Sequence, residues 1–193
     1  MTSPYSSLSV RAMASSLKAL FPALSPLLGL SPDALYARQR AFVAAGVLKA
    51  TPGRGPGSGV RASPETLAEF LIAMATHAST EENVSLALAL AKARSAHGTC
   101  PLTGARMFQD ALARILAREP LARRVREISI GVTLSQAFIR YDGAPWASLP
   151  ERQNADPHKS SVFVGKAAKR GGLSFTASIS ADILLSLARE VST

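Results

Sequence analysis

The sequence contains a single cysteine, few aromatic residues and no long uninterrupted apolar run. A single cysteine, Cys100, cannot form an internal disulfide, which excludes the disulfide-stabilised scaffolds of small secreted proteins. Lys18, Pro22 and Pro26 interrupt the most apolar early segment, so no stretch reaches the roughly 18 apolar residues that a membrane-spanning helix needs. We therefore expect no membrane segment and a chain that works in the cytoplasm.

Acidic residues are also scarce, with 13 Asp and Glu against 22 Lys and Arg in 193 residues, for a formal net charge of +9. The excess is concentrated in residues 1–61, where seven basic residues stand against one acid, Asp33, whereas residues 62–118 are balanced. A cationic segment of this kind favours a polyanionic partner such as nucleic acid. The 47% of hydrophobic residues is too high for a mostly disordered chain.

The first 32 residues contain no acid and are rich in serine, which is also typical of an organellar transit peptide. Helical spacing of apolar residues argues against that alternative, and the residues concerned are Val10, Met13, Leu17, Leu20 and Phe21. This spacing predicts a helix over 8–21 that ends at Pro22, followed by a short helix over 23–28.

A third helix is predicted over 33–46. Ser31 is a good N-cap, Pro32 suits the first turn, and Gly46 suits the left-handed residue that ends a helix. At 3.6 residues per turn, one side is apolar, with Ala34, Ala41, Phe42 and Ala45. The other side is expected to be polar, with Asp33, Tyr36, Arg40 and, at its edge, Gln39.

A glycine-rich loop follows, flanked by short apolar segments at 47–50 and 60–62. The glycines lack the lysine of a Walker loop and the spacing of a dinucleotide-binding loop. A flexible linker remains an alternative. However, the basic residues at both shoulders and at the tip, Lys49, Arg61 and Arg54, favour a β-hairpin that contacts DNA phosphates or the minor groove.

Residues 30–48, together with this glycine-rich hairpin, resemble the winged helix-turn-helix of bacterial transcription regulators. The resemblance covers residues 8–76 at most. It implies that 33–46 is the recognition helix in the major groove and that 53–59 is the tip of the wing.

The chemistry of the side chains supports this interpretation. Arg40 can bind guanine and Gln39 can pair with adenine, while Tyr36 can reach a phosphate or a base. Arg38 lies nearer the apolar side, where its stem can pack along the surface. The candidate DNA contacts are Ser31, Asp33, Tyr36, Arg38, Gln39, Arg40, Lys49, Arg54, Ser58 and Arg61.

The remaining sequence predicts helices first and strands later. The expected helices open at Ser63, at Ser79 with an end near Ala96, and after Thr103 with an end at Pro120. Period-two alternation from Arg126 to Leu134 predicts a strand. Further strands are expected at 138–141, 162–164 and 173–179, with a long loop at 144–160 and a final helix after Ser180.

The expected fold is therefore α+β in three parts. Residues 1–78 form a helical winged helix-turn-helix domain with a β-hairpin wing, 79–120 form helices that connect or dimerise, and 121–193 form an α+β domain with a small antiparallel sheet and a C-terminal helix. His97 and Cys100 are too few ligands for a zinc site, and no catalytic constellation is present. We expect no enzyme activity, cofactor or metal.

The function that these observations favour is sequence-specific binding of double-stranded DNA by a transcription regulator. A homodimer is expected, because one recognition helix reads few base pairs, and the C-terminal domain is a candidate surface for a protein partner. The alternative is an adaptor protein of a phage or mobile element that binds nucleic acid without sequence preference. A steep salt dependence without sequence preference would favour that alternative.

Overall fold

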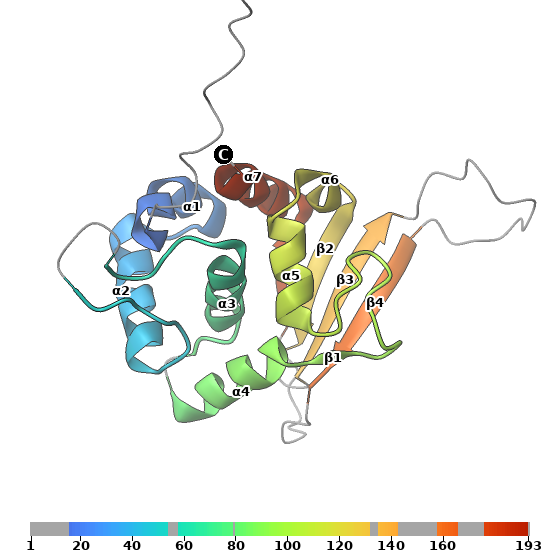
Figure 1. The fold of residues 1–193 in the computed structure, drawn as a ribbon, viewed down its shortest axis with the longest axis horizontal. Coiled ribbons are helices and arrows are strands. Elements are labelled where there is room, and N and C mark those ends of the chain that lie inside the picture. The colour runs from blue at the N-terminus through green and yellow to red at the C-terminus, as the bar shows by residue number, and fades with distance from the viewer. Residues whose placement is uncertain are drawn as a thin grey trace, which may run out of the picture.

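The computed structural model describes residues 16–53, 58–78, 80–131, 135–142, 158–165 and 176–192. These segments form the short 3-10 helix η1 (Leu17–Leu20), seven α-helices and a five-stranded antiparallel sheet, which confirms the α+β class. The helices α1 and α2 lie on one side, the sheet lies on the other, and α3 lies between α2 and α5 (Figure 1). Among the described helices, none has the length and apolar character needed to cross a bilayer.

The N-terminal helices are α1 (Phe21–Leu28) and α2 (Pro32–Ala44). Gly29, at φ +65°, ends α1 in the left-handed conformation that glycine adopts without strain. The expectation that Pro22 ends a helix is wrong, because Pro22 lies in the first turn of α1. Proline is tolerated there because N–H groups of the first turn have no partner within the helix. Residues 8–15 of the expected first helix lie outside the described part.

Two further helices follow the glycine-rich segment, α3 (Pro64–Ala75) and α4 (Glu81–Ala91). The cap expected at Ser63 is present, since its side chain accepts a hydrogen bond from the backbone N–H of Thr66. In α4 the side chain of Thr80 caps the helix, since it accepts a hydrogen bond from the N–H of Asn83. Ser79, the expected cap, lies outside the described residues.

The helix expected to reach Ala96 ends at Ala91, and this correction has a tertiary cause. Residues Arg94–Ser95 form strand β1, which pairs with β4. The helix expected to end at Pro120 is divided into α5 (Phe108–Leu116) and α6 (Glu119–Ala122), with Pro120 in the first turn of α6. Proline again begins a helix where we expected it to end one.

The sheet has the strand order β1-β4-β3-β2-β5, and all its pairs are antiparallel. Its remaining strands are β2 (Val125–Gly131), β3 (Gln136–Asp142), β4 (His158–Val164) and β5 (Thr176–Ser180). Helix α7 (Ala181–Ser192) begins directly after Ser180, as predicted. Strand β4 begins inside the segment expected to be a loop, and the predicted strand residues 132–134 and 173–175 lie outside the described part.

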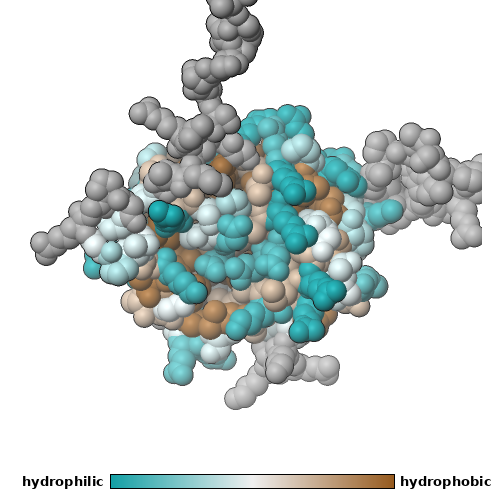
Figure 2. Space-filling model, viewed as in Figure 1, coloured by the Kyte–Doolittle hydropathy of each residue, from teal (hydrophilic) through white to brown (hydrophobic). Residues whose placement is uncertain are grey.

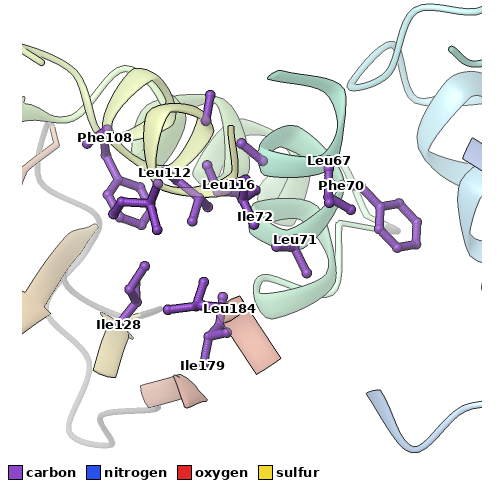
Figure 3. Packing of buried hydrophobic residues seen from close by; sticks show 14 of the residues in the cluster. Leu67, Phe70, Leu71, Ile72, Phe108, Leu112, Leu116, Ile128, Ile179 and Leu184 are labelled. Atoms are coloured by element: carbon purple, nitrogen blue, oxygen red, sulfur yellow. The ribbon is translucent and has the colours of Figure 1, made fainter. Parts of the chain in front are cut away.

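The buried hydrophobic residues form one cluster, whose members range along the chain from Leu17 to Ala188. Figure 3 shows Leu112 and Leu116 of α5 beside Ile72 of α3, while Ile128 of β2 and Leu184 of α7 lie on the sheet side of α5. The rings of Phe108 and Phe163, whose centroids are 5.5 Å apart, join α5 to β4. Helices α5 and α7 therefore cover one face of the sheet. The expected division at residues 78 and 120 stays a prediction.

The opposite face of the sheet carries polar and charged side chains beside apolar ones, among them Val164, which is 44% exposed. Glu127 of β2 forms an ion pair with Arg140 of β3 and accepts a hydrogen bond of 2.8 Å from the hydroxyl of Ser178 on β5. These contacts lower the pKa of Glu127 below its usual value, the hydrogen bond from Ser178 being the largest cause. None of the described helices covers this face (Figure 1), so its ion pair remains open to solvent.

A half-buried carboxylate lies at the contact between α3 and α5. The side-chain amide of Gln109 donates a hydrogen bond of 2.8 Å to Glu69. Burial raises the pKa of Glu69, while the hydrogen bond from Gln109 and the charge of Lys49 act in the opposite direction. Burial, together with the charge of Glu65, disfavours the charged form of Glu69 more than these two partners favour it.

Truncation of a buried leucine between α3 and the sheet tests the shared core. Leu112 is fully buried, whereas Leu88 on α4 is 40% exposed. We expect Leu112→Ala to lower the free energy of unfolding by about 2–5 kcal/mol, because it removes packed atoms and leaves a cavity. The matched control Leu88→Ala should change it by less than about 1 kcal/mol. Chemical denaturation measures both values, and equal losses would contradict this core.

Substitution of Glu69 tests the effect of its burial. Because the pKa of Glu69 is raised in the folded state, wild-type stability falls as pH rises from the unfolded-state pKa to the raised value. Glu69→Gln removes this titration and keeps an oxygen that can accept from Gln109. We expect the stability of the variant relative to wild type to increase from acidic to neutral pH. Urea denaturation at several pH values measures the difference, and a constant difference would contradict the raised pKa.

Candidate nucleic-acid interface

Helix α2, the expected recognition helix, is fixed at its start and along its inner side. The hydroxyl of Ser31 accepts a hydrogen bond of 3.2 Å from the N–H of Ala34, so this side chain serves as the predicted N-cap. Leu35 and Phe42 are buried, and the ring of Phe42 contacts that of Phe70 on α3 at 5.8 Å between centroids. The outer side of α2 is therefore held in a defined orientation.

The outer side of α2 is built from short side chains around one guanidinium. Its exposed residues are Asp33, Ala37, Arg40, Ala41 and Ala44. Four of them, Ala37, Arg40, Ala41 and Ala44, line an open depression of about 340 Å³. Short side chains allow a second surface to approach the helix backbone closely, and Arg40 can then reach into that surface. Ala41 and Ala45, which we expected on the apolar side with the buried Phe42, are both exposed.

Gln39 does not lie on the exposed side, which corrects its expected role as a base-reading residue. Its side chain is 6% exposed, and its Oε1 atom is buried without a hydrogen-bond partner among the described residues. On a helix with 3.6 residues per turn, residue 39 is one turn after Leu35, on the side that faces the core. A glutamine in that position cannot reach a base while α2 keeps its packing.

Tyr36 and Arg38 lie at the borders of the outer side, and both are half-buried. The ammonium group of Lys18 lies 4.4 Å from the centroid of the Tyr36 ring, which is a cation–π contact. From the sequence, Lys18 was considered only as a basic residue that interrupts an apolar segment, and no sequence spacing relates it to Tyr36. This contact places an exposed cation from η1 beside α2.

The segment after α2 forms the predicted hairpin pairing at one position. Thr51 and Gly59 exchange two backbone hydrogen bonds, both of 2.8 Å. Gly59 has φ +92°, a conformation that residues with a side chain rarely adopt. Ser58 is half-buried at this base, and Arg54 at the expected tip lies outside the described residues.

The two cations at the shoulders of the hairpin have different surroundings. Arg61 is exposed, and its backbone pairs with that of Ser16 before η1. Lys49 is also exposed, but its charge acts on the carboxylate of Glu69 and lowers its pKa. Of these two cations, Lys49 interacts with a carboxylate of the protein, so Arg61 is the better candidate for contact with an external anion.

The electrostatics of this region favour an anionic partner, with one opposing charge. The described cations of residues 16–61 are Lys18, Arg38, Arg40, Lys49 and Arg61. The one described acid of this segment, Asp33, is exposed on the same side of α2 as Arg40. A phosphate that approaches the N-terminus of α2 must therefore avoid Asp33. Hydrophilic and apolar patches alternate over the visible face of the molecule, without one continuous polar surface (Figure 2).

The described side chains that could ligate a metal ion are dispersed. Among the described residues, no three His, Cys, Asp or Glu side chains gather into a group that could hold a metal ion. Cys100 is buried, and its thiol lies 3.4 Å from the hydroxyl of Ser161 in β4, to which it donates a hydrogen bond. The thiol therefore contributes to the contact between the loop after β1 and the sheet.

Comparison with known proteins does not assign the chain to a family. No protein-family model matches the chain, and no curated protein or solved structure matches it. The arrangement of α2 and the adjoining hairpin must therefore be interpreted from its own contacts, exposure and charge.

Proposed function

We propose that this protein is a sequence-specific transcription regulator that binds double-stranded DNA through a winged helix-turn-helix. Helix α2 would enter the major groove, and the hairpin around 53–59 would contact phosphates or the minor groove. The observation that carries the proposal is the outer side of α2, where exposed Arg40 is surrounded by alanines. An arginine on a helix that can approach closely is suited to the O6 and N7 atoms of guanine.

The other proposed contacts with DNA have two roles: some would position the protein on the duplex, and others would read bases. Lys18 and Arg61 are exposed cations beside α2 and the hairpin, and they are suited to phosphates, which fix the orientation of a protein on the duplex. Ser31 lies at the N-terminus of α2, where backbone N–H groups favour a phosphate and the carboxylate of Asp33 opposes it. Because Gln39 is buried, it cannot read bases. Among the described polar residues on the outer side of α2, Arg40 would then carry base recognition.

The alternative function is an adaptor that binds nucleic acid without sequence preference. One observation favours it: the outer side of α2 carries a single described side chain, Arg40, that suits base recognition, together with Asp33, which repels phosphates. A surface of this kind can bind a protein partner or the DNA backbone equally well. The C-terminal domain, whose outer sheet face carries both polar and apolar side chains, would then provide a second surface for a partner.

Substitution of Arg40 and Arg61 distinguishes the two functions. A preferred site is first selected from a random duplex library, and binding is then measured over a range of salt concentrations. We expect Arg40→Ala to cost about 1–3 kcal/mol on the selected site and to relax the sequence preference. Arg61→Ala should weaken binding to all sequences alike and reduce the slope of log K against log salt by about 1.

Arg118 provides the matched control, since it is exposed at the start of α6. Arg118→Ala should bind like wild type. Selection of no preferred sequence, with the same loss in Arg40→Ala on every duplex, would favour the adaptor. Unchanged binding by Arg40→Ala and Arg61→Ala would exclude α2 and the hairpin as the interface.

A dimer is the expected form on DNA. One recognition helix reads few base pairs, and two-fold pairing doubles the site, so the selected sequence should contain two half-sites about 10–10.5 base pairs apart or a multiple of that spacing. Light scattering with and without the selected duplex measures the mass of the complex. A monomer in both samples would contradict the dimer.

A further inference from the structure

The two edges of the β-sheet differ in what lies beside them. At one edge, Arg94 of β1 forms a bridge with Met107, and the N–H of Ser95 donates to the carbonyl of Arg106 at 2.9 Å. Residues 106–107 therefore occupy that edge. At the other edge, β5 pairs with β2, and no described residue outside β2 and the adjoining α7 forms a backbone hydrogen bond with β5.

The hydrogen-bond pattern of the sheet shows which backbone groups point toward β5. In an antiparallel pair, residues alternate between directing both N–H and C=O at the neighbouring strand and directing both away from it. The N–H of Asp142 in β3 donates to the carbonyl of Arg124 at 2.8 Å, so Asp142 and every second residue before it in β3 point toward β2. The register between β3 and β2 then leaves Ile128 and Ile130 of β2 pointing toward β5.

The register between β2 and β5 identifies the outward groups of β5. The partners of these two isoleucines are Ile179 and Ala177, whose backbone groups therefore point toward β2. Thr176 and Ser178 alternate with them, so their N–H and C=O groups point away from β2. The side chains of both residues are exposed. An outward row of donors and acceptors of this kind is a template for a further strand.

Strand β5 lacks the features that usually protect an edge strand from pairing. Proteins protect such strands with charged side chains, proline, a β-bulge or a covering segment. The residues Thr176–Ser180 include no charged residue and no proline, and their pairing with β2 runs without a bulge. The exposed side chains of β5 are the short hydroxyl residues Thr176, Ser178 and Ser180. This edge is therefore suited to accept another strand.

A second copy of this chain is the partner that the edge fits. Two identical antiparallel strands are self-complementary about a twofold axis, so an outward N–H of each copy meets an outward carbonyl of the other. Copies with a net charge of +9 repel one another, and the uncharged β5 edge allows an approach that adds no further like-charge contact at the strand itself.

We propose that the protein forms a homodimer in which β5 pairs antiparallel with β5 of a second copy. The two five-stranded sheets would then form one continuous sheet. This pairing gives the interface of the dimer expected above, but it does not rest on the DNA-binding function. It is therefore tested without nucleic acid.

The mass and the amide exchange of the wild-type full chain provide the first test. Sedimentation equilibrium from micromolar to millimolar concentration should show a reversible monomer–dimer equilibrium. Amide hydrogen exchange is then followed by NMR below and above the midpoint of that equilibrium. We expect the amides of Thr176 and Ser178 to exchange more slowly in the dimer, because they become hydrogen-bonded. The amides of Ala177 and Ile179 point toward β2 and serve as internal controls whose exchange should change little.

Two substitutions of Ser178 form a matched pair for the second test. Ser178→Pro and Ser178→Ala both remove the hydroxyl that donates to Glu127, but only proline also removes the outward N–H. Proline is tolerated in edge strands where the N–H faces away from the neighbouring strand. We expect Ser178→Pro to raise the dissociation constant of the dimer at least about tenfold, because each copy loses a hydrogen bond to the other. Ser178→Ala should dimerise as wild type does, and circular dichroism checks that both variants fold.

Each contrary result overturns the proposal in a different way. A monomer at every concentration would exclude the dimer. A dimer whose Thr176 and Ser178 amides exchange at a rate independent of concentration would place the interface elsewhere, and this outcome needs no variant. Equal dissociation constants for Ser178→Pro and wild type would do the same. Equal weakening by proline and alanine would assign the effect to the hydroxyl. Failure to bind DNA would overturn the proposed function and leave this dimer intact.

Discussion

The burial of α3 is the constraint on which the rest of the structure depends. Its buried residues are Leu67, Ala68, Phe70, Leu71, Ile72 and Ala73, which leaves little of the helix facing solvent. Phe70 points away from α5 (Figure 3), and its ring contacts those of Phe21 and Phe42. Ile72 lies on the side of α5, which in turn covers the sheet. A single helix thus connects the cationic N-terminal helices to the β-sheet through continuous apolar contacts.

This arrangement explains how a chain with a net charge of +9 can leave its cations exposed without losing stability. Apolar burial supplies the main favourable term in folding, so the surface charges are free for other purposes. Lys18, Arg40 and Arg61 lie around α2 and the hairpin, whereas Arg94 and Arg106 lie at the edge of the sheet. The shared core thus holds the cationic N-terminal helices and the sheet in fixed positions relative to one another.

Sequence reasoning succeeded where the cause is local and failed where the cause is distant. The caps at Ser31 and Ser63 depend on a side chain and an N–H three residues away, and both were predicted. Pro22 and Pro120 were interpreted as helix ends because proline disrupts a preceding helix. The same residue type suits a first turn, and the packing of α1 and α6 on α7 decides which of the two outcomes applies.

The sequence by itself determined the periodicity of the helices and strands, the caps, the α+β class and the cationic character of the N-terminal segment. These properties depend on residues that are neighbours along the chain. Only the tertiary structure decided that Gln39 faces the core, that Lys18 lies over Tyr36, and that the segment after α4 becomes a strand. It also placed Arg94 and Arg106 on paired segments at the same edge of the sheet. Each of these outcomes depends on contacts between segments that are distant along the chain. The free energy of such contacts exceeds the local preference of a segment for helix or strand, and the spacing of residues in the sequence does not reveal it.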